Sequence, residues 1–488
     1  MAETSLKGKA VKGVLWNAVN TYSMKGLQFV LGIILARLLS PSDYGLVGMT
    51  SIFFAISSVF IDSGFGSALV QKKDRNEDDY CTVFYVNFVV SLFFYCVLFV
   101  IAPLVANFFE QPLLKDLMRV SALTLIINAL VSTSRNKLYV AVDFKTLTKI
   151  SVSSSVVSGV VALCCAFSGY GVWTFVIQGL VSTFVYALLL FYFVRWIPKR
   201  KFSKSSFQKL FGYGSKILVA SLITVLYDNI YNFIIGKKFS ATSLGYYTKG
   251  NGFASFAGNN TASILQSVAF PVLSDIQDDL PRLLSAYSRY IKMVAFFVFP
   301  FLMGLCGIAK PFVLFLITEK WASCIIFMQI LCFAYLWDGI IRINLNLLYV
   351  TGRTDLVLKL EVIKKSVAFT ILIVSMFFGI IGMCFGRVIY AIVAFYMNTY
   401  YTKRILNYGF YTQIKEIAPS FMLSASMMVI ALVVSHVVTT PILSLAISLI
   451  VCPVYYLTLS YIFKVSSLFE LLDIFAKKTN NNNPLQRL

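Results

Sequence analysis

The sequence has little charge, a single histidine and no metal-binding cysteine motif. Only 13% of its 488 residues are charged, about half of the 25% that is typical of soluble domains. The lone histidine is His436, and none of the nine cysteines forms a CxxC pair. We therefore expect neither a cofactor nor a bound metal, and we predict that the cysteines, which lie in apolar stretches, are small packing residues.

Apolar residues, in contrast, make up 58% of the chain, and the mean hydropathy is +0.80. At roughly 20 apolar residues per crossing, a chain of this length has room for about 12 to 14 membrane-spanning helices and for no sizeable soluble catalytic domain. Apolar runs predict an all-α polytopic membrane protein with about 14 spans: Val14–Leu39, Leu46–Val70, Thr82–Ala106, Leu113–Ser134, Leu147–Phe167, Gly171–Val194, Phe211–Ile235, Tyr246–Leu273, Ile291–Ile308, Cys324–Val350, Leu356–Phe378, Ile380–Tyr400, Ile417–Val438 and Ile442–Phe463.

The basic residues indicate how the chain is oriented. With the N-terminus inside, the even-numbered connections and both chain ends hold 28 of the 42 Lys and Arg residues, against seven on the opposite side. Cytoplasmic loops carry the excess of Lys and Arg in membrane proteins. The sequence therefore predicts a multi-pass protein of the cytoplasmic membrane with both termini in the cytoplasm.

Two weak internal repeats indicate a duplication. LSPSDYGL at Leu39–Leu46 aligns with FSATSLGY at Phe239–Tyr246, an offset of 200, and NKLYV at Asn136–Val140 aligns with NLLYV at Asn346–Val350, an offset of 210. We predict an N-lobe of six spans (1–205), a C-lobe of six spans (206–405), and a last segment (406–488) with two spans and a polar C-terminal tail. Repeats of this kind place the substrate path between the lobes, near the bilayer midplane.

Apart from the charges near the ends of the predicted spans, eleven charged residues fall inside them, where each costs roughly 2.5 to 3.5 kcal/mol unless a partner, water or a function compensates. The bases are Lys25, Lys216, Lys249, Arg342, Lys364, Lys365 and Arg387, and the acids are Asp62, Asp228, Asp338 and Glu361. Spacing of four residues on one helix predicts two structural ion pairs, Asp338 with Arg342 and Glu361 with Lys365.

The charges that remain are mostly positive. A cationic cavity that holds a diphosphate is predicted from the bases within spans together with two at the ends of the first and seventh spans: Lys25, Arg37, Lys216, Lys237, Lys249 and Arg387, with Lys364 as a further candidate. The alternative for the two end residues is that they reach the lipid headgroups. Asp62 and Asp228 are candidates for coupling transport to an ion gradient, or each balances a lysine.

Two segments in the second half depart from a plain apolar span. The eighth span, residues 246–273, has so many Gly, Asn and Ser residues that we expect it to be broken or to line water. The segment that follows Pro281 predicts an amphipathic interfacial helix, with Leu283, Leu284, Tyr287 and Ile291 on one face.

Several of these stretches resemble the Wzx-type polysaccharide or O-antigen flippases of the multidrug, oligosaccharidyl-lipid and polysaccharide exporter superfamily. They are LARLLSPSDYGLVGM (Leu35–Met49), FIDSGFGSALVQKKD (Phe60–Asp74), DFKTLTKIS (Asp143–Ser151), GYGVW (Gly169–Trp173), FGYGSKILVASL (Phe211–Leu222), FSATSLGYY (Phe239–Tyr247), FPVLSDIQDD (Phe270–Asp279) and LEVIKKSV (Leu360–Val367). The resemblance covers about residues 5–465. It implies two six-helix lobes around a V-shaped central cavity, with two further C-terminal helices. It also implies transfer of undecaprenyl-diphosphate-linked oligosaccharide from the inner to the outer leaflet of the bacterial inner membrane, for lipopolysaccharide or exopolysaccharide synthesis.

Two other functions compete with this interpretation. An ion-coupled drug exporter of the same superfamily would need a carboxylate-rich cavity for cationic drugs, whereas the bases in spans outnumber the acids. A membrane-embedded glycan polymerase, ligase or acyltransferase would need catalytic groups at a membrane face, and His436 alone does not supply them. The expected partners are therefore the lipid-linked oligosaccharide and the bilayer, not nucleic acid. The glycan, the coupling ion and any polymerase or export partner stay open.

Overall fold

The computed structural model describes residues 2–62 and 64–481, and the description leaves out the side chains of residues 2–12, 14, 262–272, 354 and 474–481. All regular elements within these residues are helices. The chain divides into two compact units, Met1–Gly245 and Tyr246–Leu488. The helix α9, which the predicted lobes assign to the second half, falls in the first unit.

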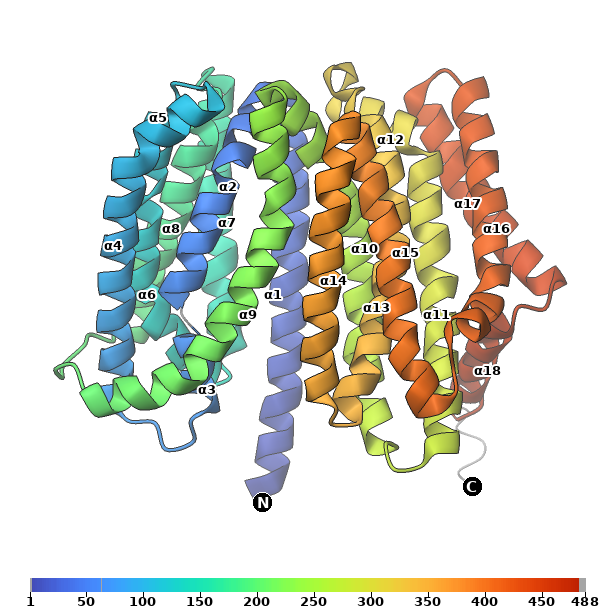
Figure 1. Cartoon of the computed structure of the whole chain (residues 1–488), viewed down its shortest axis with the longest axis horizontal. Helices are drawn as coiled ribbons and strands as arrows, with labels where there is room; N and C mark the ends of the chain where they lie inside the picture. Colours follow the sequence, from blue (N-terminus) through green and yellow to red (C-terminus); the bar gives the residue numbers. More distant parts are fainter. Residues whose placement is uncertain (1, 63, 482–488) are drawn as a thin grey trace. The chain divides into compact units, whose positions relative to one another are not determined.

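The first unit is a bundle of long helices joined by short connections (Figure 1). The first turns of α9 run crosswise to the rest of that helix in Figure 1. The helices are α1 (Ala2–Leu38), α2 (Pro41–Asp62), α3 (Phe65–Gln71), α4 (Glu77–Phe109), α5 (Leu114–Ser121), α6 (Leu123–Val140), α7 (Phe144–Phe167), α8 (Trp173–Val194), α9 (Lys204–Lys238) and the first residues of α10 (Ala241–Asp275).

Small residues on α7 allow α1 to lie against it along most of its length. The Thr148 hydroxyl donates to the carbonyl oxygen of Trp16 at 3.3 Å, and a Cβ on Gly159 would lie 2.7 Å from Leu31 Cδ1. Further along, Leu35 and Leu39 pack on Ala162 and Ala166. In a bilayer, where burial of apolar surface drives little helix association, such close packing of small residues holds helices together.

The two copies of the repeated segment begin helices α2 and α10 in the same way. The Asp43 carboxylate accepts hydrogen bonds from the backbone N–H and the hydroxyl of Ser40, at 2.8 and 2.7 Å. At the second copy, the Ser240 hydroxyl accepts from the backbone N–H of Ser243 at 3.1 Å. In both copies a serine just before the helix thus satisfies an N–H of the first turn, and glycine follows five residues later at Gly45 and Gly245.

These two glycines make reciprocal contacts. A Cβ added to Gly45 would lie 1.7 Å from the carbonyl oxygen of Ala241, and one added to Gly245 would lie 1.8 Å from the carbonyl oxygen of Pro41. Each glycine therefore leaves just enough room for the first turn of the other helix. The two copies of the repeated segment are therefore in contact with each other.

The second unit contains the remaining helices. They are most of α10, then α11 (Leu280–Gly307), α12 (Ala309–Ile317), the short 3-10 helix η1 (Glu319–Trp321), α13 (Cys324–Val350), α14 (Thr354–Ser375), the 3-10 helix η2 (Met376–Phe378), α15 (Gly379–Leu406), α16 (Phe410–Val437), α17 (Pro441–Ile462) and α18 (Ser466–Asn481).

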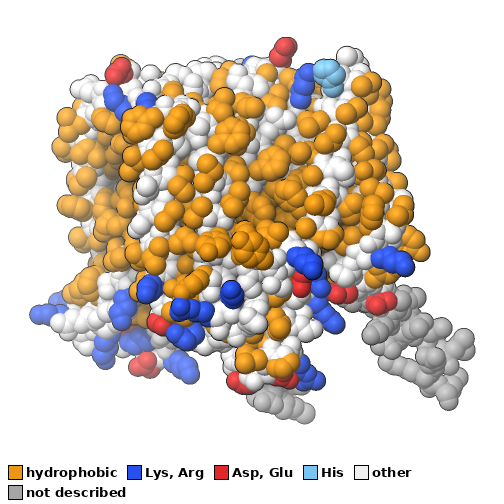
Figure 2. All heavy atoms as spheres, turned by 45° about the vertical axis from the view of Figure 1, so that its right-hand side comes forward, with side chains coloured by type: hydrophobic (Ala, Val, Ile, Leu, Met, Phe, Trp, Pro, Cys, Tyr) orange, Lys and Arg blue, Asp and Glu red, His pale blue; other side chains and the backbone are white. Residues whose placement is uncertain are grey.

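Eleven helical segments of the described residues are long and apolar enough to cross a membrane. One of them, Asp355–Leu406, joins α14, η2 and α15 and so covers two predicted spans. The predicted first and eighth spans fall on α1 and α10, which are not among the eleven. A multi-pass helical membrane protein is thus confirmed, and the number fourteen stays a prediction. Figure 2 shows a broad band of hydrophobic side chains on one face, with Lys and Arg side chains gathered mostly below it.

Two predictions about the second half need correction. The eighth span is not broken, because α10 is one helix from Ala241 to Asp275, and the alternative that it lines water stays a prediction. Its glycines serve packing instead: a Cβ on Gly250 would lie 2.8 Å from the carbonyl oxygen of Cys324, and one on Gly258 would lie 2.7 Å from Tyr335 Cβ. The small face of α10 thus lies against α13.

The amphipathic segment after Pro281 is not a separate interfacial helix either. It is the first part of α11, which continues to Gly307, and the Asp279 carboxylate caps its start by accepting from the N–H of Arg282 at 3.1 Å. Its predicted apolar face is buried in protein, since Leu283, Tyr287 and Ile291 are fully buried. Helical periodicity identified the face but could not tell a protein neighbour from a lipid surface.

Candidate functional site

The polar residues Lys216, Thr224 and Asp228 of α9 are exposed. At 3.6 residues per turn, Thr224 and Asp228 share one side of the helix, whereas Lys216 points about 120° away from Asp228. Lys216 and Asp228 lie about 18 Å apart along the axis, at about 1.5 Å per residue. Lys216, Ser221 and Thr224 line a shallow cavity of about 510 Å³ on this helix.

Other residues of α9 pack on the rest of the first unit. Tyr227 and Tyr231 are buried and their rings meet edge to face, with centroids 6.2 Å apart. The Asn232 side-chain amide donates to the Ser51 hydroxyl of α2 at 3.4 Å. These contacts fix the rotation of α9, so that Asp228 is left on the exposed face.

The two predicted bases at the ends of α1 and α9 are exposed. Lys237 forms an ion pair with Glu110 at 3.1 Å, and its ammonium lies 4.9 Å from the centre of the Phe108 ring. Because the Glu110 side chain is 82% exposed, this pair contributes at most about 1 kcal/mol. Arg37 is exposed in the last turn of α1, and Lys25, twelve residues earlier, is half-buried.

The structure separates the two candidate coupling acids. Asp62 is the last residue of α2, is 63% exposed, and forms an ion pair with Arg135 of α6 at 3.4 Å. Asp228 forms no ion pair with any residue of the described chain and lies ten residues from the end of α9. The alternative to ion coupling is that each acid balances a lysine. Asp62 has such a basic partner, although it is an arginine and not a lysine.

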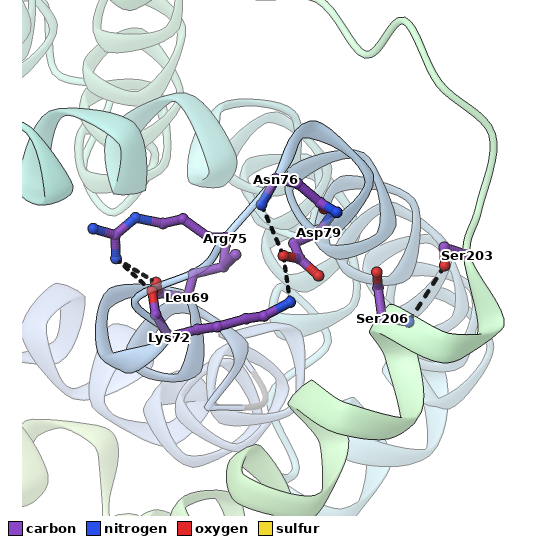
Figure 3. A network of polar contacts seen from close by, with 7 residues as sticks. All are labelled: Leu69, Lys72, Arg75, Asn76, Asp79, Ser203 and Ser206. Carbon is purple, nitrogen blue, oxygen red and sulfur yellow. Dashed lines mark hydrogen bonds and ion pairs between the residues drawn. The ribbon is translucent and has the colours of Figure 1, made fainter.

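A buried carboxylate that the sequence analysis missed connects three segments of the first unit (Figure 3). Asp79, in the first turn of α4, is fully buried and forms an ion pair with Lys72 at 2.7 Å. It also caps α4 by accepting from the N–H of Asn76 at 3.0 Å. Figure 3 shows Ser206 of α9 facing this carboxylate. The group therefore holds the turn between α3 and α4 beside the start of α9.

Replacing Asp79 by asparagine should lower the free energy of unfolding by about 2 to 3 kcal/mol, because Lys72 would keep its charge in a mostly buried place without a counter-charge. Thermal unfolding of the detergent-purified protein measures this. Asp78→Asn is the matched control, since Asp78 pairs with Arg200 across an exposed 3.4 Å contact and its loss should cost under about 1 kcal/mol. Equal stability of the Asp79 variant and wild type would contradict the assignment.

In the second unit, Arg387 lies where three helices meet. Its guanidinium donates to the Tyr335 hydroxyl of α13 at 2.8 Å and to Asn251 Oδ1 of α10 at 3.4 Å. The Tyr335 hydroxyl in turn donates to Asn251 Oδ1 at 3.0 Å. Two neutral groups thus orient this predicted substrate-binding cation on α15.

Lys249 lies among aromatic rings. Its ammonium is 5.4 Å from the centre of the Phe253 ring and 5.7 Å from that of Trp321. Both distances are within the range of cation–π attraction, which is strongest where water is excluded.

Residues of the two predicted structural pairs have other partners in the described structure. Arg342 donates instead to Asn259 Oδ1 of α10 at 2.8 Å, and its pair with Asp338 is not among the ion pairs of the described residues. Glu361 forms an ion pair with the buried Lys364, three residues on. A spacing of four residues puts two side chains on the same face of a helix. Long side chains can also reach a residue of another helix, or a residue three positions away on the same helix. The pair of Glu361 with Lys365 stays a prediction.

Sequence reasoning missed the neutral partners of these cations, Asn251, Asn259 and Tyr335. The unusual Asn content of the eighth span was the available signal, but it does not reveal which cation each amide faces. A second buried polar group was also missed: Tyr287 donates to Asn344 Oδ1, and the Asn344 side-chain amide donates to Gln413 Oε1 at 3.1 Å. Within the described residues, no group of three or more His, Cys, Asp or Glu side chains could hold a metal ion.

Comparison with known proteins places this geometry in context. Residues 34–326 match the family described as "Polysaccharide biosynthesis protein". The chain is 26% identical to an uncharacterized membrane protein in the cps region of Klebsiella pneumoniae, over 79% of this chain and 80% of that protein. It is 24% identical to the lipopolysaccharide biosynthesis protein WzxC of Escherichia coli (strain K12), over 80% of both chains. The fold is similar to that of the lipid II flippase MurJ in an inward closed conformation, with a TM-score of 0.70 at 17% identity over 92% of this chain and 98% of that one. The resemblance found in the sequence motifs is thereby confirmed.

Proposed function

The chain belongs to the polysaccharide biosynthesis protein family, and we propose that it is a flippase that moves undecaprenyl-diphosphate-linked oligosaccharide from the inner to the outer leaflet of a bacterial inner membrane. The names of two similar proteins, the lipopolysaccharide biosynthesis protein WzxC and the lipid II flippase MurJ, support a lipid-linked glycan as the substrate.

The exposed charges on α9 carry this proposal. Lys216 and Asp228 are both exposed on a helix that is long and apolar enough to span the membrane, and neither forms an ion pair within the described residues. A charge that faced acyl chains at this depth would cost several kcal/mol. The part of α9 that bears these two charges is therefore expected to meet water and the polar part of a substrate.

The substrate's charge accounts for the surplus of bases. A diphosphate head is an anion, and a guanidinium or an ammonium binds phosphate oxygens through charge-assisted hydrogen bonds. A cell interior that is negative by 100 mV drives each negative charge outward by roughly 2.3 kcal/mol. The barrier that the protein must lower is passage of the charged, sugar-bearing head through hydrocarbon, and cations in the spans lower it. In this mechanism the lipid tail stays in the bilayer, and the two predicted lobes alternately expose the site to each side.

Restoration of surface polysaccharide in a flippase-null strain tests the proposal. The strain would supply repeat units of defined chemistry, and wild-type protein should restore export of at least one of them. Resistance to cationic dyes is measured in the same cells. Strong dye resistance without restored export would contradict the flippase and favour the drug exporter.

Asp228→Asn should change the dependence of export on the proton or sodium gradient, because this carboxylate is exposed within the membrane depth of α9 and has no ion-pair partner among the described residues. Asp62→Asn should leave that dependence unchanged, since its ion pair with Arg135 lies at the exposed end of α2. The measurement is export while each gradient is collapsed separately with a selective ionophore. Identical gradient dependence in the Asp228 variant and wild type would leave Asp228 without a coupling role.

A further inference from the structure

Arg342, like Arg387, is a charged residue of the second unit that a neutral group orients. Its one hydrogen bond within the described residues is the 2.8 Å contact with Asn259 Oδ1. Its side chain is half-buried on α13, a helix long and apolar enough to span the membrane. A pair with Asp338, one turn earlier, is not among the ion pairs of the described residues.

This environment leaves most of the guanidinium unused. Arginine has five N–H donors in a fixed plane, and one of them is taken by Asn259. An amide oxygen orients the plane but does not neutralise the charge. A cation in a span without a counter-charge needs water or an anion. Among the described residues, Asn259 thus positions the guanidinium and no acid pairs with it.

The contact has a parallel along the same helix. Asn251 accepts from Arg387, and Asn259 accepts from Arg342, so that two asparagines eight residues apart on α10 each orient one arginine. Eight residues correspond to about 12 Å along the helix axis. The two asparagines therefore mark two successive levels along α10.

The two arginines also lie at different predicted depths in the membrane. Arg342 is eight residues from the end of α13 at Val350, and Arg387 is eight residues from the start of α15 at Gly379, about 12 Å in each case. In the predicted orientation, α13 ends and α15 begins on opposite sides of the membrane, with the end of α13 on the cytoplasmic side. Arg342 is then the nearer of the two to the inner leaflet.

We propose that Arg342 is a substrate-binding residue that first receives the diphosphate of the lipid-linked substrate, and that Arg387 binds it next, with Asn259 and Asn251 as positioning residues. This rests on the proposed function, which supplies an anionic lipid head that enters from the inner leaflet. It assigns Arg342 to substrate binding, where helical spacing alone predicts a structural ion pair with Asp338.

Native mass spectrometry of the purified full-length protein tests the binding step. The probes are undecaprenyl diphosphate and undecaprenol, which share the tail and differ in charge. Arg342→Gln should weaken binding of the diphosphate about tenfold and leave binding of undecaprenol unchanged, because only the charge-assisted hydrogen bonds are lost. The diphosphate affinity of Arg342→Lys should lie between those of Arg342→Gln and wild type, since lysine keeps the charge but not the planar pair of donors. The control Arg353→Gln, at an exposed arginine before α14, should bind like wild type.

Transport in proteoliposomes tests the order of the two positions. Arg342→Gln should raise the substrate concentration that gives half-maximal flipping, and Asn259→Leu should shift it in the same direction by less. Arg387→Gln should mainly lower the maximal rate. A purely structural Arg342 would instead lower the amount of folded protein without changing that concentration.

The outcomes separate the two proposals. Undiminished diphosphate binding by Arg342→Gln, or an equal loss for both lipids, would overturn the role of Arg342. If wild-type protein bound undecaprenyl diphosphate no better than undecaprenol, the proposed function itself would fail, whatever the variants did.

Discussion

Gly45→Ala should destabilise the protein by more than about 3 kcal/mol and reduce export to less than about a tenth of wild type. The added Cβ would lie 1.7 Å from the carbonyl oxygen of Ala241, and backbone on both sides leaves no flexible group to move. Gly245→Ala should have the same effect, because its Cβ would lie 1.8 Å from the carbonyl oxygen of Pro41. Thermal unfolding and export in the flippase-null strain measure the two effects.

Other helical glycines are the matched controls, because there the change to alanine should stabilise the protein. Glycine to alanine inside a helix normally stabilises by roughly 0.5 to 1 kcal/mol, since alanine loses less backbone entropy on folding. Gly26→Ala on α1 and Gly252→Ala on α10 should do so, because nothing lies within 4 Å of the added Cβ at either position. The double variant at Gly45 and Gly245 should cost less than the sum of the single variants, since one separation of the two first turns relieves both clashes. A stable, fully active Gly45→Ala protein would show that the two helix starts can move apart without cost.

The same glycines show how far the sequence predicted the fold. The aligned copies LSPSDYGL and FSATSLGY indicated a duplication, and long apolar runs located the apolar middle of the long helices. The helices α1 and α11 begin 12 and 11 residues before the predicted spans, because their first turns are polar. The reason for Gly45 lies in the backbone of Ala241, almost 200 residues away, and no local pattern carries that information. Likewise, the Gly content of α10 predicted an unusual span, but only the neighbouring α13 shows that the glycines allow close packing and not a break.

The charged residues follow a similar division. Counting Lys and Arg in predicted spans identified Lys216, Arg342 and Arg387 as residues that need an explanation. Their partners depend on which helices are neighbours, and so the local rule of four residues missed the contact between Arg342 and Asn259. Asp79 escaped notice for the opposite reason. It lies in a polar connection where acids are ordinary, and its complete burial comes from the fold alone.

Simultaneous replacement of Lys25, Lys216, Lys249 and Arg387 by glutamine should abolish glycan export while protein abundance stays near that of wild type. Each change removes a cation from a predicted membrane helix, so the free-energy cost of placing that helix in the apolar membrane falls. At the same time the diphosphate loses its counter-charges. Export in the flippase-null strain and the amount of protein in membranes are measured together. Stability and function should therefore move in opposite directions, which distinguishes a binding role from a structural one.

The charge-conserving set, with arginine at the three lysines and lysine at Arg387, is the control for this experiment. It keeps all four positive charges and changes only shape, so it should retain a substantial part of export, with most of the loss at Arg387, whose planar guanidinium reaches both Tyr335 and Asn251. Full export by the glutamine set would refute the predicted cationic cavity. Loss of the protein from the membrane with both the glutamine set and the charge-conserving set would instead show that these side chains hold helices together. A side chain with that structural role is needed for folding, whether or not substrate is present.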